Sequence, residues 1–93
     1  MILEIYYINN GKLASIPVIY SSTATVAVAN GKATLTHNLN ITSNYNIQVM
    51  CISNLNIVLP YTSSANSVGL SFYDSDMLPI SNGTRVINYI IFV

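Results

Sequence analysis

Apolar and polar residues alternate on both sides of an Asn-Gly pair near the middle of the chain. Val26 and Val28 alternate with small residues before Asn30-Gly31, and Ala33 and Leu35 alternate with threonines after it. A period of two is typical of a strand with one buried face. An Asn-Gly pair between two such runs favours a type I′ turn, because both central residues need positive φ. The pattern therefore predicts a β-hairpin formed by residues 23–29 and 32–37.

The rest of the chain repeats this design of short alternating runs and polar turns. Eight strands are predicted, over residues 2–8, 13–20, 23–29, 32–37, 45–52, 54–59, 68–73 and 85–93. Strands at such regular intervals indicate a single all-β domain, residues 1–93, folded as an antiparallel β-sandwich of about eight short strands. A small β-barrel is the alternative. Residues 1–20 are expected to form an N-terminal hairpin that packs on the main body or reaches a neighbour as an assembly arm.

Prolines and apolar rows refine these strands. Pro17 lacks the N–H of a ladder and predicts an edge or a bend, whereas Pro60 is expected to end its strand and to open a loop over residues 61–66. Residues 85–93 are apolar on both faces apart from Asn88, so this strand is expected to be central or covered by another subunit. The predicted inward rows of two other strands are Tyr45, Ile47, Val49 and Cys51, and Val68, Leu70 and Phe72.

The chain carries very little charge. Only 6% of its residues are charged, three basic and three acidic, whereas about a quarter are charged in an average soluble protein. The chain has no excess of basic residues that could bind along a phosphate backbone, so we expect no nucleic-acid partner. A net charge near zero also removes the usual protection against self-association. The composition therefore suits a subunit that is partly covered in an assembly.

Cysteine content and the chain start bear on where the protein works. Cys51 is the single cysteine, so no internal disulfide is expected, and its place between Met50 and Ile52 predicts a buried apolar role. No apolar run reaches the length of about 18 residues that predicts a membrane span. The first residues lack the basic start and cleavage site of a signal peptide. We therefore expect synthesis in a cytoplasm.

Few residues could carry chemistry. His37 is the only histidine, and at a strand end it is expected to bond a turn backbone rather than to act as a base. Asp74 and Asp76 form the one acidic cluster and could offer oxygens to a cation, but the pattern of an EF-hand loop is missing, so turn residues are the preferred interpretation. No catalytic, cofactor-binding or metal-binding residues are predicted, and the chain is not expected to be an enzyme.

Tyrosine is abundant, with seven residues in the chain. Its large ring and polar tip suit cores, interfaces and sugar stacking alike. Tyr61 and Tyr73 lie beside predicted loops, so together with Asp74 and Asp76 they are the candidate ligand or interface residues. Core or interface roles are favoured over a ligand platform.

Four short motifs resemble small β-sandwich domains of virion appendage and decoration proteins, in viruses that infect bacteria and archaea. The motifs are residues 31–39 (GKATLTHNL), 45–49 (YNIQV), 66–72 (NSVGLSF) and 83–91 (GTRVINYII). The resemblance covers residues 30–93. It implies a structural, commonly trimeric domain that attaches to a capsid or tail or faces a host receptor, without catalytic residues.

The resemblance thus suggests a non-enzymatic virion subunit, a capsid decoration, fibre or turret component, that assembles with itself and with other virion proteins. Two alternatives stay open: a carbohydrate- or receptor-binding module that contacts a host surface glycan, and a non-viral structural domain of a surface layer or filament. The candidate assembly residues lie near the two chain ends: Ile2, Leu3, Ile5, Tyr7, Ile91, Phe92 and Val93.

Overall fold

The computed structural model describes residues 3–9 and 11–92, and within them the chain is all-β, as predicted. The strands are β1 (Leu3–Asn9), β2 (Lys12–Ala29), β3 (Lys32–Thr36), β4 (Asn46–Cys51), β5 (Ile57–Ser63), β6 (Ser67–Tyr73) and β7 (Asn82–Phe92). All of their pairings are antiparallel. Among the described residues there is no helix that could cross a membrane.

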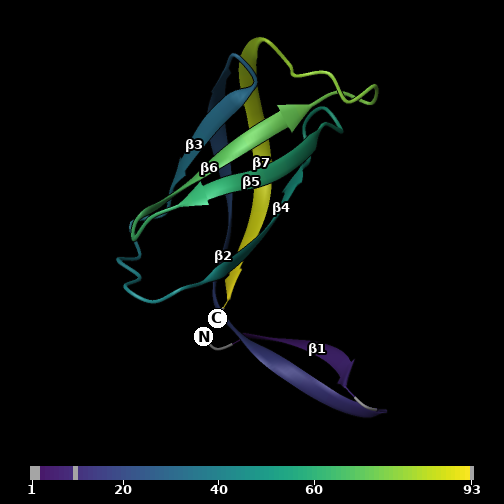
Figure 1. Ribbon diagram of the computed structural model, residues 1–93, viewed down its shortest axis with the longest axis vertical. Coiled ribbons are helices and arrows are strands. Elements are labelled where there is room, and N and C mark those ends of the chain that lie inside the picture. The colour runs from purple at the N-terminus through teal and green to yellow at the C-terminus, as the bar shows by residue number, and fades with distance from the viewer. Residues whose placement is uncertain (1–2, 10, 93) are drawn as a thin grey trace.

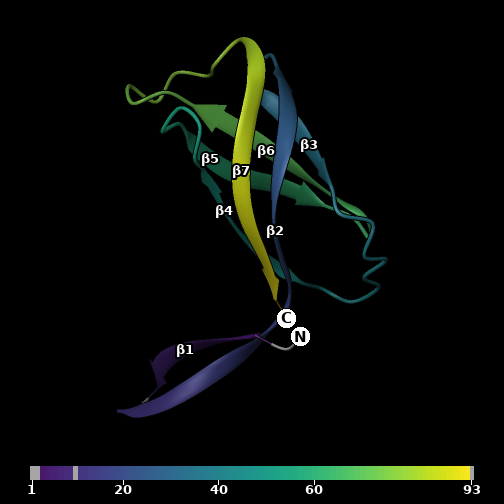
Figure 2. The same cartoon turned by 180° about the vertical axis from the view of Figure 1, so that it is seen from behind.

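The strands belong to one sheet rather than to two packed sheets. Six of them follow the order β4-β7-β2-β3-β6-β5, and β1 pairs with β2 outside this path. The six-stranded sheet curls on itself until its end strands, β4 and β5, approach each other (Figures 1 and 2). The expected sandwich of eight strands is therefore not confirmed. The described residues form a nearly closed barrel, which lies nearer to the alternative.

The described residues form seven strands, one fewer than predicted, because β2 is continuous. Separate strands were expected over residues 13–20 and 23–29, whereas β2 runs through both. Its first part pairs with β1 and its second part with β7, and a register shift lies between Val18 and Tyr20. Pro17 pairs with β1 ahead of the first β7 contact at Val18, so it sits at an edge, as predicted.

A second correction concerns β5. Pro60 was expected to end this strand, but β5 continues to Ser63, so Tyr61 lies in a strand and not in a loop. β5 is an end strand of the sheet, and its register to β6 shifts between Pro60 and Thr62. An edge with a bulge is a position where a strand accepts proline.

The inward rows of the barrel strands meet in one core, and the predicted inward rows are confirmed. Phe72, Leu70 and Val68 on β6 are fully buried, as are Ile87 and Ile91 on β7. On β4 the row is half-buried until Cys51, which is buried. β7 is central, between β4 and β2, in agreement with its apolar faces. Each large core side chain contributes roughly 1.5–3 kcal/mol by leaving water.

The predicted Asn-Gly turn joins β2 to β3. Asn30 and Gly31 both have positive φ, 53° and 79°, as a type I′ turn requires. The Asn30 N–H donates to the Ser81 carbonyl at 2.6 Å, and the Gly31 carbonyl accepts from the Phe72 N–H at 2.8 Å. A Cβ on Gly31 would lie 2.9 Å from the Cβ of Pro79. The turn is therefore packed against the segment that leads into β7.

We expect Gly31→Ala to lower the free energy of unfolding by about 2–4 kcal/mol, since it adds overpacking to the cost of positive φ. Gly11→Ala is the control, because Gly11 has φ +77° with nothing within 4 Å of the added Cβ. Urea unfolding of both variants measures the difference. Equal losses in the two variants would contradict the packing of this turn.

Candidate functional site

The N-terminal hairpin stands apart from the barrel. We call β1 together with residues 12–17 of β2 the arm; its register runs from Asn9↔Lys12 towards Leu3↔Val18. Both views show the arm projecting away from the barrel end where β7 finishes (Figures 1 and 2). Among the described strands these arm segments pair with each other, and beyond that only Leu3 pairs with Val18, the next residue of β2. An isolated two-stranded hairpin is marginally stable in water, so the arm needs a further contact.

The candidate assembly residues divide into four groups. Leu3, Ile5 and Tyr7 lie in β1, in the arm. Ile91 is fully buried in the core, so within the single chain it lies in the barrel interior and not on the surface. Phe92 is half-buried and pairs with Asn46 and with Val18. The remaining two, Ile2 and Val93, lie outside the described residues.

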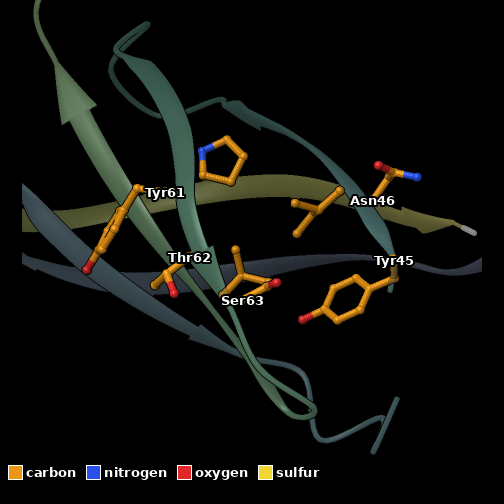
Figure 3. Close-up of a pocket in the computed structure, with 8 residues that line it drawn as sticks. Tyr45, Asn46, Tyr61, Thr62 and Ser63 are labelled. Atoms are coloured by element: carbon orange, nitrogen blue, oxygen red, sulfur yellow. The ribbon is translucent and has the colours of Figure 1, made fainter. Parts of the chain in front are cut away.

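A gap remains where the barrel does not close. We call the space between β4 and β5, the end strands of the sheet, the seam. A cavity of about 310 Å³ lies in it, with Tyr45 at one end and Tyr61 at the other (Figure 3). Its lining also includes buried Val68, so it reaches the core. The cavity is lined by Tyr45, Asn46, Ile47, Pro60, Tyr61, Thr62, Ser63 and Val68.

Large apolar side chains are exposed on both sides of the seam. Among residues 20–92, six of the nine exposed large hydrophobic residues fall between residues 50 and 61, on β4, the following loop and β5. No charged residue occurs between residues 46 and 63. Sheet edges are usually guarded by charges against association, and this edge has only Pro60. We call this set the apolar stripe: Met50, Ile52, Leu55, Ile57, Leu59 and Tyr61.

A chain of hydrogen bonds ties one end of the seam. The Leu39 N–H donates to Nδ1 of His37 at 3.1 Å, which leaves the proton on Nε2. Nε2 lies 2.9 Å from the hydroxyl of Tyr45, and this hydroxyl donates across the seam to the Ser64 carbonyl at 2.7 Å. His37 thus bonds a turn backbone, as predicted, and joins β4 to the turn after β5.

Burial shifts the pKa values of two side chains in this hydrogen-bonded chain. Desolvation lowers the pKa of His37 below its ordinary value of 6.5. Desolvation likewise raises the pKa of Tyr45, against a smaller opposite effect of a hydrogen bond. Both side chains are therefore held in their neutral forms, which suits the bond directions.

Tyr61 is half exposed, at 52%, but its ring is not a free platform. It lies across Gly69, where an added Cβ would come within 2.7 Å of the ring Cζ atom. The Lys32 Nζ atom sits over the ring at 5.0 Å from its centroid, within cation–π range. The ring is thus held in place at one end of the cavity.

The other candidate ligand residues lie away from the seam cavity. Asp74 organises a turn, because its Oδ1 accepts the N–H groups of Asp76 at 2.9 Å and Leu78 at 3.0 Å. Asp76 is exposed on this turn, and Tyr73 ends β6 beside a bridge to Pro79. No group of three or more His, Cys, Asp or Glu able to hold a metal occurs within residues 3–9 and 11–92.

Cys51 is buried, as predicted, and belongs to the core. Burial raises the pKa of its thiol, but backbone hydrogen bonds from Asn54, Ser53 and Asn56 and the Ser53 hydroxyl lower it, and the net pKa lies below the ordinary value. The thiol is 4% exposed, which keeps it from solvent.

Sequence reasoning missed the seam cavity. Tyr45 was assigned to the core, and Thr62 and Ser63 to a loop, because Pro60 looked like the end of a strand. The available signal was the uncharged run over residues 46–63, which is unusual for two consecutive strands that end a sheet.

We expect Tyr45→Phe to lower the free energy of unfolding by about 1–3 kcal/mol, because the Ser64 carbonyl and the His37 Nε2–H lose their partner. Tyr61→Phe is the control, with an expected change within about 0.5 kcal/mol at this exposed ring. Thermal or urea unfolding measures both. Equal losses would show that the bridge to Ser64 does not stabilise the barrel.

Stability should fall on acidification below pH 6.5. The unfolded chain protonates His37 near 6.5, but the folded chain does so only at lower pH, so unfolding takes up a proton within this window. The stability continues to fall until the pH drops below the pKa of His37 in the folded chain. No other side chain of the sequence ordinarily titrates between about pH 5 and 8. The free energy of unfolding is measured from pH 7 to 5 for the natural protein and for His37→Gln. Equal dependence on pH in the two proteins would contradict this role of His37.

Known proteins provide no guide to this site. Comparisons of the chain with models of protein families, with curated proteins and with solved structures found no match. The function is therefore inferred from the arm, the seam and the apolar stripe, together with the short motifs that resemble virion domains.

Proposed function

We propose that the protein is a non-enzymatic structural subunit that assembles with copies of itself through the arm, as a component of a virion. The observation that carries the proposal is the arm itself, whose two segments pair with each other and, among the described strands, reach the barrel only through β2 at Val18. Such a hairpin gains stability when another surface covers it. A second copy is the simplest source of that surface, because most soluble oligomers are symmetric homo-oligomers.

The virion setting is supported by the resemblance of the four motifs. They fall on β3, β4, β6 and β7, whose inward rows supply most of the core. A net charge of zero is compatible with a subunit that is covered by its neighbours, including other virion proteins. A capsid decoration, a fibre or a turret component all fit this description, and a trimer is the expected closed form.

A structural role also agrees with how the few reactive side chains are used. His37 is held by the Leu39 N–H and by Tyr45, and Asp74 holds a turn. Cys51 packs in the core. These side chains already serve the fold, so the proposal assigns none of them to catalysis.

A carbohydrate- or receptor-binding module is the second candidate. It is favoured by the uncharged cavity at the seam, which Tyr45 and Tyr61 flank and whose lining also includes Asn46, Thr62 and Ser63 (Figure 3). Sugar binding normally uses an open aromatic face, whereas the Tyr61 ring lies between Gly69 and Lys32. Assembly is therefore the better supported function.

Light scattering over a concentration series tests the proposal. We expect the full chain to form a closed homo-oligomer and the double variant Ile5→Asp/Tyr7→Asp to be monomeric, because two charges cannot be buried unpaired at an interface. Thr25→Asp/Ala27→Asp is the matched control, with the same spacing on exposed positions of β2 in the barrel. Circular dichroism verifies that the barrel stays folded.

A full chain that stays monomeric at high concentration would overturn the proposal. So would an oligomer that survives the two charges in the arm. Growth of the assembly without limit would favour a filament or lattice over a closed virion appendage.

A further inference from the structure

Both edges of the arm carry backbone groups that no other described strand pairs with. β1 pairs with β2 on one side, and among the described strands it has no partner on its other side. Val18 pairs with Leu3 of β1 and also with Phe92 of β7, so β1 and β7 lie on opposite sides of β2. The side of β2 that β7 covers from Val18 onward is therefore open along residues 12–17, where the arm projects from the barrel (Figures 1 and 2).

Pro17 indicates which backbone groups point outward from the arm. It pairs with Glu4 and has no N–H to donate to the ladder, so this pair belongs to the non-hydrogen-bonded set. Such pairs alternate with hydrogen-bonded ones, and their N–H and C=O groups point away from the other strand of the arm. Each open edge thus presents three residues, with one donor missing at Pro17. The outward set consists of Glu4↔Pro17, Tyr6↔Ser15 and Ile8↔Leu13.

The two open edges of the arm fit each other. β1 and β2 are antiparallel, so β1 of one copy is antiparallel to β2 of the next when both arms point the same way. A contact of two β1 edges about a twofold axis would leave the β2 edge open in both copies. A head-to-tail contact uses both edges of every arm, and it forms a ring when the rotation between copies closes. A closed ring of strands has no edge left for uncontrolled association.

We infer that the arms of three copies pair head to tail, β1 of each against residues 12–17 of β2 in the next, and form one closed antiparallel ring of six strands. The inference rests on the proposed self-assembly through the arm, and it adds the edges that meet and their order. Three copies agree with the trimer expected for the closed form. In the ring every arm segment has a strand on both sides, which relieves the marginal stability of an isolated hairpin.

Proline and alanine at the same position separate the backbone from the side chain. Tyr6→Pro removes an outward N–H of β1, whereas Tyr6→Ala keeps it. We expect Tyr6→Pro to be monomeric at concentrations where the natural protein is trimeric, and Tyr6→Ala to remain trimeric. Ser15→Pro and Ser15→Ala should repeat this contrast on the β2 edge. Light scattering measures all four variants.

A disulfide across the arm shows whether proline acts on the contact or on the hairpin itself. Ile8→Cys and Leu13→Cys are introduced together with Cys51→Ser, because the two residues of a non-hydrogen-bonded pair lie close enough for the bond. With the two strands of the arm joined in this way, Tyr6→Pro should still abolish the trimer and Tyr6→Ala should still keep it. A trimer that survives Tyr6→Pro in the joined arm would overturn the ring. The buried Cys51 is retained if Cys51→Ser weakens the barrel.

Cysteine pairs between copies identify the edges that meet. A protein with Tyr6→Cys is mixed with proteins that carry Leu13→Cys, Ser15→Cys or Pro17→Cys, which sample three registers along the β2 edge. We expect a cross-linked heterodimer with at least one of the three. Tyr6→Cys should not cross-link to itself, since β2 separates any two β1 strands in the ring. Thr25→Cys, at an exposed position of β2 in the barrel, is the negative control.

The outcomes separate the ring from the proposed self-assembly. Cross-linking of Tyr6→Cys to itself, in an oligomer that Ile5→Asp/Tyr7→Asp abolishes, would show a twofold contact of β1 strands. That result would overturn the ring and leave assembly through the arm standing. An oligomer that needs the arm but gives no cross-link between arms would have the same consequence, because the arm would then dock on another part of its neighbour. A full chain that stays monomeric would remove both proposals.

Discussion

Side-chain alternation along the strands is the constraint on which the whole structure depends. Each barrel strand can put only one of its two rows inside, and the inward rows of β6 and β7 fill the centre with Phe72, Leu70 and Ile87. More than half of the chain is apolar, so some strands have apolar residues in both rows. On β5 the second row is necessarily outside, where it forms the apolar stripe with Leu59 and its neighbours. A barrel of this size therefore leaves apolar surface that a partner can cover.

The edges of the sheet decide where that surface lies. β4 and β5 come near each other without a ladder, and the bond from Tyr45 to Ser64 ties them at one end. His37 contacts this hydroxyl through Nε2, so the contact depends on the protonation state of the imidazole. A cavity remains between the end strands, and it opens beside the apolar stripe.

Much of this was predictable from local pattern. The Asn30-Gly31 turn, the inward rows of β4 and β6, the central place of β7 and the turn role of His37 all follow from residue type and spacing. The breaks at Pro17 and Pro60 were harder, because a proline ends a central strand but is accepted at an edge, and the sequence does not say which strands are edges. The choice between a sandwich and a nearly closed barrel depends on long-range pairing, such as β2 with β7, which periodicity does not encode.

The same limit applies to the candidate site. Tyr61 was identified for its exposure, but its position over Gly69 and under Lys32 depends on three strands coming together. Tyr45 and Thr62 line one cavity only because the sheet curls until its ends meet. The spacing of residues along the chain does not predict that these side chains come together.

Amide hydrogen exchange of the arm, measured below and above the concentration of assembly, tests the central claim most directly. The account predicts that the amides of β1 exchange rapidly in the monomer, whereas those of β6 and β7 are protected, and that β1 becomes protected when copies associate. Protection of β1 in the monomer equal to that of the barrel would contradict it, since the arm would then be stable without a second copy.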